Sequence, residues 1–246
     1  MINKKDISVV IQGPIDDRTF ESIDSYAEQG FTDIIVSTWE DEDLSLLEKT
    51  KNNFNVVLCQ YPDKVKIKNE GAKFYIAKTT LSGCLQAKGE YVLKVRSDEL
   101  YPNLDKFINN FKNHPNRIHT TNNGFWKHIP ACFSNHIFLS KKSLMIDCCN
   151  SIVRYCLDDS GVDDLAAEQV FGISFIQVLG GSTQNWKEEF KNHIFITPCH
   201  DLPDHLHSGQ SSSRYRFRRH TDYPNNRPDG KHHNLKNLYN HHSEIL

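Results

Sequence analysis

Two adjacent carboxylates, Asp98 and Glu99, follow a short apolar run and have the chemistry of a cation site. The run from Tyr91 to Val95 is typical of a buried strand, so the acids after it stand where a strand ends. A hard divalent cation, held by one or two carboxylates and by phosphate oxygens, neutralises the diphosphate of a nucleotide. The segment 97–99 could supply such ligands. The alternative interpretation is an exposed acidic turn.

A second charged group lies near the C-terminal end of the chain, where Arg214–Arg219 contains four arginines and two aromatic residues. Guanidinium groups bind diphosphate oxygens through paired hydrogen bonds, so the segment could grip a nucleotide. It could equally contact anionic lipid head groups near a lipid-linked acceptor. A solvated basic tail is the third interpretation.

The acidic pair belongs to one of three polar loops that follow apolar strand-like runs. The loops are Gln12-Gly13-Pro14, the stretch from Ser37 to Asp41, and the stretch from Arg96 to Glu99. In an open parallel sheet, ligands bind beyond the carboxyl ends of the strands. We therefore expect the three loops to converge on one pocket.

The elements that must position these loops alternate between strand and helix in the first hundred residues. The pattern predicts strands over 7–12, 33–37, 55–59 and 91–95 and helices over 19–29, 44–51 and 71–88. Short apolar strands that alternate with helices are typical of a mostly parallel sheet covered on both faces. The fold class that we predict is α/β, a Rossmann-type three-layer α/β/α sandwich with a mostly parallel central sheet.

The second half of the chain is less regular. It predicts helices over 104–113, 143–157 and 163–179 and strands over 117–121 and 136–139. From Thr197 the apolar periodicity ends, and histidine, arginine, asparagine, serine and proline dominate. We interpret residues 1–196 as one domain and 197–246 as a basic tail or an active-site flap.

Composition excludes several classes of protein. The chain has 246 residues, a formal net charge of −2 and 38% hydrophobic residues, which indicates a globular protein and not a dedicated nucleic-acid binder. It has seven cysteines and no CxxC pair, which is typical of reduced, buried thiols. The sequence contains no signal-peptide pattern and no stretch long enough to cross a membrane. We expect a cytoplasmic protein that at most touches the inner face of a membrane.

The order of these segments resembles the WavE-type lipopolysaccharide-synthesis family, whose members are identified as GT-A glycosyltransferases. The similar segments are VVIQGP at 9–14, IIVSTWE at 34–40, the helix over 69–88 and GEYVLKVRSD at 89–98, with looser similarity at 133–136 and 167–169. The chain departs from the pattern at two places. The family helix often carries an arginine where this chain has Lys73 or Lys78, and the usual DxD reads Ser97-Asp98-Glu99, without the first acid.

The resemblance implies a nucleotide-sugar donor bound by residues 1–100 and an acceptor bound by residues 101–196. Gln12, Gly13 and Pro14 would line the base and ribose, and Glu40 or Asp41 would accept hydrogen bonds from either. Lys73 would reach a phosphate, and Arg96 and Ser97 would belong to the same donor site. The resemblance implies that Asp98 holds Mn²⁺ or Mg²⁺, with Glu99 and the late histidine His200 as further ligands. Surface histidines are the alternative for His200.

An inverting sugar transfer also needs a carboxylate that takes the proton of the acceptor hydroxyl. Asp164 and Glu168 are four residues apart and would share one face of a helix that begins near Asp163. Helix capping and the helix dipole offer a different reason for acids at this place. A retaining mechanism would need no such base.

The function that we expect is metal-dependent, inverting transfer of a sugar from a nucleotide-sugar donor to a lipid-linked or oligosaccharide precursor of lipopolysaccharide or capsular polysaccharide. Two alternatives stay open. A sugar nucleotidyltransferase would usually need a glycine-rich phosphate loop, whereas the first loop has a single glycine, Gly13. A non-catalytic nucleotide- or sugar-binding module would explain the missing first acid of the DxD pattern.

Overall fold

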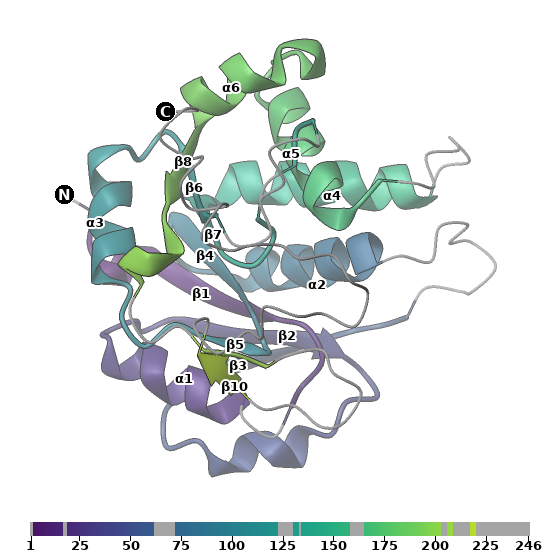
Figure 1. The fold of residues 1–246 in the computed structure, drawn as a ribbon. Helices are drawn as coiled ribbons and strands as arrows, with labels where there is room; N and C mark the ends of the chain where they lie inside the picture. The colour runs from purple at the N-terminus through teal and green to yellow at the C-terminus, as the bar shows by residue number, and fades with distance from the viewer. Residues whose placement is uncertain are drawn as a thin grey trace, which may run out of the picture.

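A seven-stranded sheet runs through the centre of the protein (Figure 1). Across the sheet the strands are β3 (Asn55–Cys59), β2 (Ile34–Trp39), β1 (Ile7–Gln12), β4 (Tyr91–Arg96), β7 (Phe138–Lys141), β6 (Ile118–Thr121) and β8 (Ile194–Thr197). The structure is a computed structural model that describes residues 2–16, 19–61, 72–122, 130–132, 134–157, 165–202, 206–208 and 217–219, with 72, 200, 206–208 and 217–219 described by backbone alone.

The sheet is mostly parallel, as the alternating pattern predicts. β1 pairs in parallel with β2 on one side and with β4 on the other, and β6 pairs in parallel with β8. β7 lies antiparallel between β4 and β6. In this register the last residue of β1, Gln12, stands opposite Ser37 of β2 and Arg96 of β4.

Helices cover both faces of the sheet and complete three layers (Figure 1). One face carries α1 (Thr19–Glu28), the 3-10 helix η2 (Leu44–Lys49) and α3 (Asp105–Asn113). The other face carries α2 (Ala72–Gln86), α4 (Lys142–Leu157), α5 (Ala167–Val178) and α6 (Trp186–His193). Short 3-10 turns precede β1 (η1, Lys4–Asp6), join α5 to α6 (η3, Thr183–Asn185) and follow β8 (η4, Cys199–Asp201).

Successive side chains along each strand point to opposite faces of the sheet. The core is therefore divided into two apolar clusters, one on each side of the sheet. Val9 and Ile11 pack toward α1 and α3, whereas Val10 packs toward α2. Gly83 lets α2 approach the sheet closely, because a Cβ at this position would lie 2.4 Å from a methyl carbon of Val10. Burial on both faces explains why the central strands read as continuous apolar runs.

A second, three-stranded sheet lies beside the first and contains β5 (Glu99–Leu100), β9 (Leu206–Ser208) and β10 (Phe217–Arg219). β9 pairs antiparallel with both β5 and β10, and residue 207 stands opposite Glu99. Part of the region interpreted as a tail or flap therefore forms strands next to the segment that follows Asp98.

The structure reproduces most of the predicted strands and helices with small shifts at their ends, but two predicted helices differ. The segment predicted as a helix over 44–51 is the 3-10 helix η2, and α5 begins at Ala167, after an extended Ala166. The prediction that a helix beginning near Asp163 would place Asp164 and Glu168 on one face was therefore wrong. The structure also adds elements that the sequence pattern did not predict. These are α6, β8, the 3-10 turns η1, η3 and η4, and the three short strands of the second sheet. All seven cysteines are buried free thiols, as predicted. None of the helices in the described part of the chain has the length and apolar character that crossing a membrane requires.

Candidate functional site

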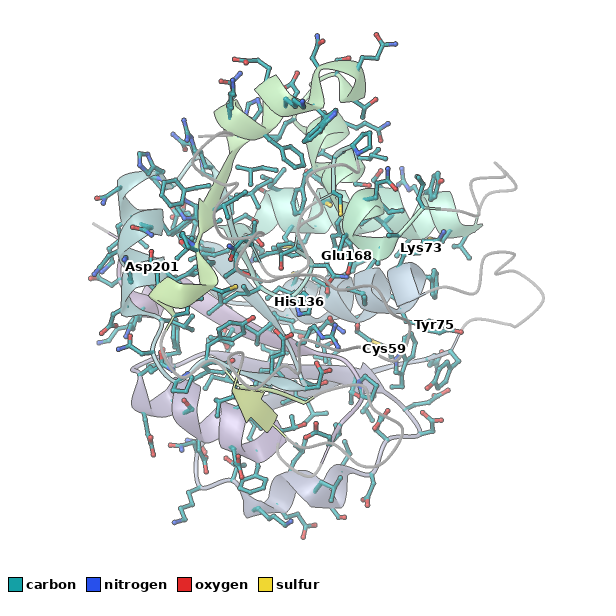
Figure 2. All side chains as sticks on the ribbon, in the orientation of Figure 1. Cys59, Lys73, Tyr75, His136, Glu168 and Asp201 are labelled. Carbon is teal, nitrogen blue, oxygen red and sulfur yellow. The ribbon has the colours of Figure 1, made fainter. Side chains whose placement is uncertain are left out.

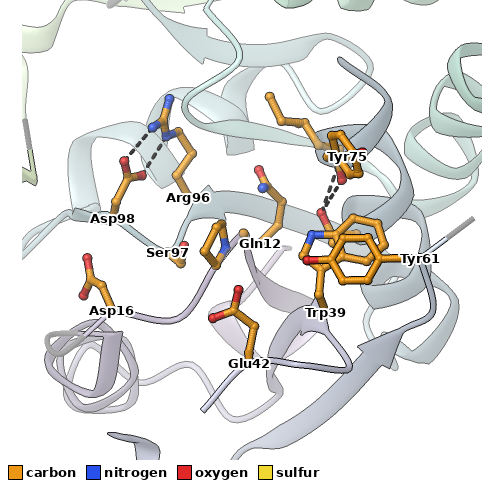
Figure 3. Close-up of a pocket in the computed structure, with 13 residues that line it drawn as sticks. Gln12, Asp16, Trp39, Glu42, Tyr61, Tyr75, Arg96, Ser97 and Asp98 are labelled. Carbon is orange, nitrogen blue, oxygen red and sulfur yellow. Dashed lines mark hydrogen bonds and ion pairs between the residues drawn. The ribbon is translucent and has the colours of Figure 1, made fainter. Parts of the chain in front are cut away.

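A pocket of about 450 Å³ opens at the carboxyl ends of β1, β2 and β4 (Figure 3). The chain places β2 and β3 on one side of β1 and then β4 on the other side, so the order of the strands reverses between β1 and β4. Ligands of open α/β sheets bind at such a reversal. We call this cavity the switch-point pocket. It is lined by Gln12, Gly13, Pro14, Asp16, Trp39, Glu42, Tyr61, Tyr75, Ile76, Thr79, Arg96, Ser97 and Asp98.

Backbone hydrogen bonds hold the floor of the pocket together. The Ser97 amide donates to the Gln12 carbonyl at 2.9 Å, and the Gly13 amide donates to the Ser37 carbonyl at 3.2 Å. Gly13 has a φ of 126°, and a Cβ there would lie 2.7 Å from Ser97 Oγ. Only glycine satisfies both the backbone conformation and the close contact. The predicted loops at the ends of β1 and β4 therefore meet at Gly13 and Ser97.

Arg96 and Asp98 form a two-pronged ion pair on one wall of the pocket (Figure 3). Arg96 Nε donates to Asp98 Oδ1 at 2.7 Å, and Nη2 donates to Oδ2 at 2.5 Å. Both side chains are more than four-fifths buried. The pKa of Arg96 is raised, because the hydrogen bond to Asp98 and the nearby carboxylates outweigh the opposing effect of burial. Such bidentate pairs are among the stronger polar contacts in proteins.

Glu99 points away from the pocket and is completely buried. Tyr101 donates its hydroxyl proton to Glu99 Oε2 at 2.7 Å, and His136 Nδ1 contacts Oε1. Arg96 Nε also lies 3.9 Å from Oε1. Glu99 therefore lies on the core side of the Arg96 guanidinium, and it is not among the residues that line the pocket.

Three aromatic side chains form the opposite wall, and we call Trp39, Tyr61 and Tyr75 the aromatic cluster. Trp39 and Tyr61 are stacked with ring centroids 4.5 Å apart, and Tyr75 meets Trp39 edge-on at 5.4 Å. Burial against its neighbours and a hydrogen bond to Asp41 raise the pKa of Tyr61 to about 12. The cluster is an apolar surface with the shape and size to stack on a flat ring.

The acidic turn after β2 contributes Glu42 to the pocket. The two acids of this turn that we predicted from the sequence, Glu40 and Asp41, do not line it. Glu42 Oε2 accepts a hydrogen bond from the Ile15 amide at 2.9 Å. Burial, and then the charge of Asp41, raise the pKa of Glu42. Glu40 and Asp41 are exposed on the same turn, and Asp41 reaches the pocket only through its hydrogen bond to Tyr61.

Lys94 lies in the core behind the pocket, two residues before Arg96 on the same strand. Its side chain is completely buried, its Nζ donates to the Asn135 carbonyl, and it lies 5.3 Å from the centre of the Phe138 ring. Burial, and then the charge of Arg96, lower the pKa of Lys94 to about 7. The strand thus carries a buried lysine amine in the interior and a guanidinium at the pocket.

The predicted donor residues separate into two groups. Six of them meet in the pocket: Gln12, Gly13, Pro14, Arg96, Ser97 and Asp98. Lys73 does not line the pocket. It is 4% exposed on the α4 side of α2 (Figure 2), and its charge lowers the pKa of Cys156 against the larger, opposite effect of burial. A cation near the last turn of α4 suits the negative end of that helix.

The predicted acceptor-side residues lie elsewhere or outside the described residues. Glu168 is half-buried in the first turn of α5 and does not line the pocket. α5 packs against α2, which supplies Tyr75, Ile76 and Thr79 to the pocket. Asp164 lies outside the described residues. His200 belongs to η4, where only its backbone is described, and the predicted Arg214–Arg219 segment is described only as the backbone of 217–219.

The described residues offer a divalent cation a single carboxylate at the predicted position. Asp98 faces the pocket, but Arg96 occupies both of its oxygens, and among the described residues no three histidine, cysteine or acidic side chains form a cluster that could hold a metal. Mg²⁺ commonly binds through one or two carboxylates together with substrate phosphates. Asp98 fits that role for a cation that arrives with a diphosphate, and the pocket has no preformed cage among its described residues.

Several lining residues were not predicted as site residues. Asp16, Glu42, Tyr61, Tyr75, Ile76 and Thr79 line the pocket without having been singled out, and Trp39 lines it from within a predicted loop without having been named as a site residue. The signal for Tyr61 was present, because it follows the carboxyl end of β3, next to β2. Tyr75 and Thr79 are four residues apart and therefore share one face of α2, which the sequence alone does not assign to the pocket.

Comparison with solved structures finds proteins of similar structure whose sequence identity to this chain is low. Two structures of HddC from Yersinia pseudotuberculosis, one of them complexed with GMP-PN, are each 11% identical over 57% of this chain and 78% of theirs, with TM-scores of 0.39 and 0.38. A Bacillus anthracis protein that bears the name glucose-1-phosphate thymidylyltransferase, in complex with sucrose, is 9% identical over 78% of this chain and 86% of its own, with a TM-score of 0.47. No curated protein matches the chain.

The match to a protein family is more direct. The family model for WavE lipopolysaccharide synthesis matches residues 7–129, which is half of the chain. The matched part contains β1 to β6 and all the described residues that line the switch-point pocket. The chain is therefore a member of the WavE lipopolysaccharide synthesis family.

Proposed function

We propose that the protein is a glycosyltransferase that moves a sugar from a nucleotide-sugar to a lipid-linked or oligosaccharide precursor of lipopolysaccharide or capsular polysaccharide. One observation carries the proposal: a single pocket at the strand reversal combines the aromatic cluster with the Arg96–Asp98 pair. A nucleotide-sugar needs both kinds of surface, a stacking surface for its base and a polar wall for its diphosphate. Membership in a lipopolysaccharide synthesis family supports the same assignment.

The two walls support one orientation of the proposed donor. The base would stack against the aromatic cluster at the ends of β2 and β3, and the diphosphate would lie toward Arg96 at the end of β4. Arg96 has donors on a planar guanidinium that match phosphate oxygens as well as carboxylate oxygens. It would therefore turn part of its hydrogen bonding from Asp98 to the diphosphate.

The negative charge of the pocket lining implies that a bound diphosphate also needs a cation. The described lining residues include the carboxylates of Asp16, Glu42 and Asp98 and the guanidinium of Arg96. A diphosphate adds further negative charge to a pocket whose described lining is already acidic, which is unfavourable in a partly buried site. Mn²⁺ or Mg²⁺ bound by Asp98 would neutralise the charge that develops on the departing nucleoside diphosphate.

For the acceptor step we propose Glu168 as the general base. Its position in the first turn of α5, a helix that packs against the pocket helix α2, supports the proposal. The Glu168 carboxylate would take the proton of the acceptor hydroxyl while the bond between the sugar and the diphosphate breaks. Glu168→Gln should then lower kcat about 100-fold or more and leave donor binding unchanged.

A thermal-shift panel tests the assignment. Nucleoside diphosphates and nucleotide-sugars of the four common bases, each with and without Mn²⁺, should include at least one that raises Tm, more strongly with the metal. Asp98→Ala should abolish the metal-dependent part of the shift. Asp24→Ala is the matched control, because Asp24 is a hydrogen-bonded carboxylate on α1 outside the pocket. No shift with any of these compounds would refute nucleotide binding.

Analysis of the reaction products separates the alternative chemistries. Release of pyrophosphate from a nucleoside triphosphate and a sugar phosphate would identify a nucleotidyltransferase. Nucleotide binding without transfer or slow hydrolysis of the donor would identify a binding module. Release of a nucleoside diphosphate together with glycosylation of an acceptor is the outcome that we expect.

A further inference from the structure

The carboxamide of Gln12 is the unexplained polar group of the switch-point pocket. Gln12 is only 5% exposed and lines the pocket, yet within the described part of the chain its Oε1 has no hydrogen-bond partner. Buried side-chain oxygens nearly always have a partner, because leaving one unpaired forfeits the hydrogen bonds that it had with water. Gln12 therefore has a lone pair available to a donor that enters the pocket.

The sheet sets the place of this oxygen relative to the two walls. Gln12 stands opposite Ser37 on β2 and opposite Arg96 on β4. Neighbouring strands are about 4.8 Å apart, so β2 and β4 lie about 10 Å apart with Gln12 midway between them. Figure 3 shows the same order, with the Arg96–Asp98 pair on one side of Gln12 and the aromatic cluster on the other.

A nucleotide has one chemical group between its flat base and its phosphates, the ribose. We infer that Gln12 is the residue of this protein that recognises the ribose hydroxyls of the nucleotide; the inference rests on the proposed function. A carboxamide both donates and accepts hydrogen bonds, as does each hydroxyl of a ribose. The unpaired Oε1 accepts a hydroxyl proton, so ribose completes the hydrogen bonding that the protein alone leaves unfinished.

This role makes Gln12 a specificity residue that separates ribonucleotides from deoxyribonucleotides. A site built around a hydrogen bond to a hydroxyl discriminates against the analogue without it, because the protein group is then left buried and unpaired. We expect a ribonucleoside diphosphate to bind about 10- to 100-fold more tightly than its 2′-deoxy or 3′-deoxy form, whichever hydroxyl Gln12 contacts.

Calorimetric titration of the full chain with uridine, cytidine, guanosine and adenosine diphosphates, and with the 2′-deoxy and 3′-deoxy form of each, tests the inference. Wild type should discriminate against at least one deoxy form. Gln12→Met, which keeps the volume of the side chain, should bind the ribo and deoxy forms equally, at the affinity that wild type has for the deoxy form. Thr121→Val is the matched control, because it also removes a buried oxygen without a described partner but lies outside the pocket. It should keep the wild-type ratio.

The outcomes separate this inference from the proposed function. A wild-type protein that binds a nucleotide but does not distinguish ribose from either deoxyribose overturns the role of Gln12 and leaves the proposed function intact. That comparison needs no variant, so it decides the question even if Gln12→Met fails to fold. A wild-type protein that binds none of the nucleotides refutes the proposed function, and the role of Gln12 with it.

Discussion

Arg96 and Asp98 stand two residues apart at the end of β4 and face each other across two hydrogen bonds of 2.7 and 2.5 Å. The pair lies at the pocket, and the buried Glu99 lies 3.9 Å behind the guanidinium. Arg96 is thus held between two carboxylates, one facing the pocket and one facing the core. This arrangement keeps Asp98 in place without a cation and gives a diphosphate a guanidinium that is already oriented.

A double-mutant cycle measures this ion pair. Arg96→Gln and Asp98→Asn, singly and together, should give a coupling of about 1–2 kcal/mol in the free energy of unfolding, because the pair is bidentate and mostly shielded from water. Urea unfolding without ligand provides the measurement. The surface pair Lys4–Asp105, at 2.8 Å but with Asp105 largely exposed, is the control and should show less than about 0.5 kcal/mol. Equal coupling in the two pairs would contradict the expectation.

Substitution of Gly13 should affect both stability and binding. Gly13→Ala places a Cβ 2.7 Å from Ser97 Oγ in a backbone conformation that only glycine adopts easily. We expect a loss of more than about 1–2 kcal/mol of stability and loss of the Tm increase produced by a nucleotide. Gly180→Ala has a positive φ as well, but no atom lies within 4 Å of the added carbon. It should lower Tm without changing the nucleotide shift, and a nucleotide shift kept by Gly13→Ala would count against the pocket.

Tyr61 should bind the base and not the phosphates. Stacking of a base on an aromatic side chain contributes about 1–3 kcal/mol, so Tyr61→Ala should weaken nucleoside diphosphate binding about tenfold or more. The affinity for inorganic pyrophosphate, measured by the same titration, should stay the same. Leu58→Ala removes an exposed apolar side chain from the adjoining strand β3 and should change neither affinity. Equal losses for both ligands with Tyr61→Ala would disprove the assignment of the two walls.

Lys94 should make stability depend on pH in the alkaline range. Its pKa is about 7 in the folded protein against an ordinary value of 10.5, so between these values the unfolded chain binds a proton that the folded protein does not. The free energy of unfolding should therefore gain a contribution that rises from about pH 7 to about pH 10, by up to about 1.4 kcal/mol per pH unit.

Urea unfolding at pH 7, 8 and 9 measures that contribution. Lys94→Met should remove it and make the pH profile flatter, whereas Lys78→Met, at a half-buried position of α2, should keep the wild-type slope. If Lys94→Met left the slope of unfolding free energy against pH unchanged, burial would not be keeping the Lys94 amine neutral in this pH range.

The sequence was sufficient to predict the strands that build the pocket, because β1, β2 and β4 are buried on both faces and read as apolar runs that end in polar loops. It could not decide which acid of each loop faces the cavity. Asp98 lines the pocket while Glu99 is buried behind it, since β5 begins at Glu99 and turns that side chain toward Tyr101. After β2, the turn brings Glu42 to the pocket and leaves Glu40 exposed.

The three strands of the second sheet, which sequence reasoning missed, have a common physical reason for being hard to predict. β5 has two residues, and β9 and β10 have three each. Strands this short cannot show the alternation of apolar and polar residues by which a strand is recognised in a sequence. β5 and β9 pair across more than a hundred residues of sequence, and a local pattern holds no information about such a contact. Lys73 illustrates the same limit, because its place beside α4 follows from helix packing.

The second sheet also sets an order for how the protein assembles during synthesis. All seven strands of the central sheet have been made once Thr197 has been translated, whereas β5 receives its partner strand β9 only from residues 206–208, and β9 receives β10 from residues 217–219. A chain grows from its N-terminus and folds as its parts become available. The segment next to Asp98 is therefore the last part of the pocket's framework to gain its neighbours, and a released chain that ends at residue 202 would contain all seven strands of the central sheet without them.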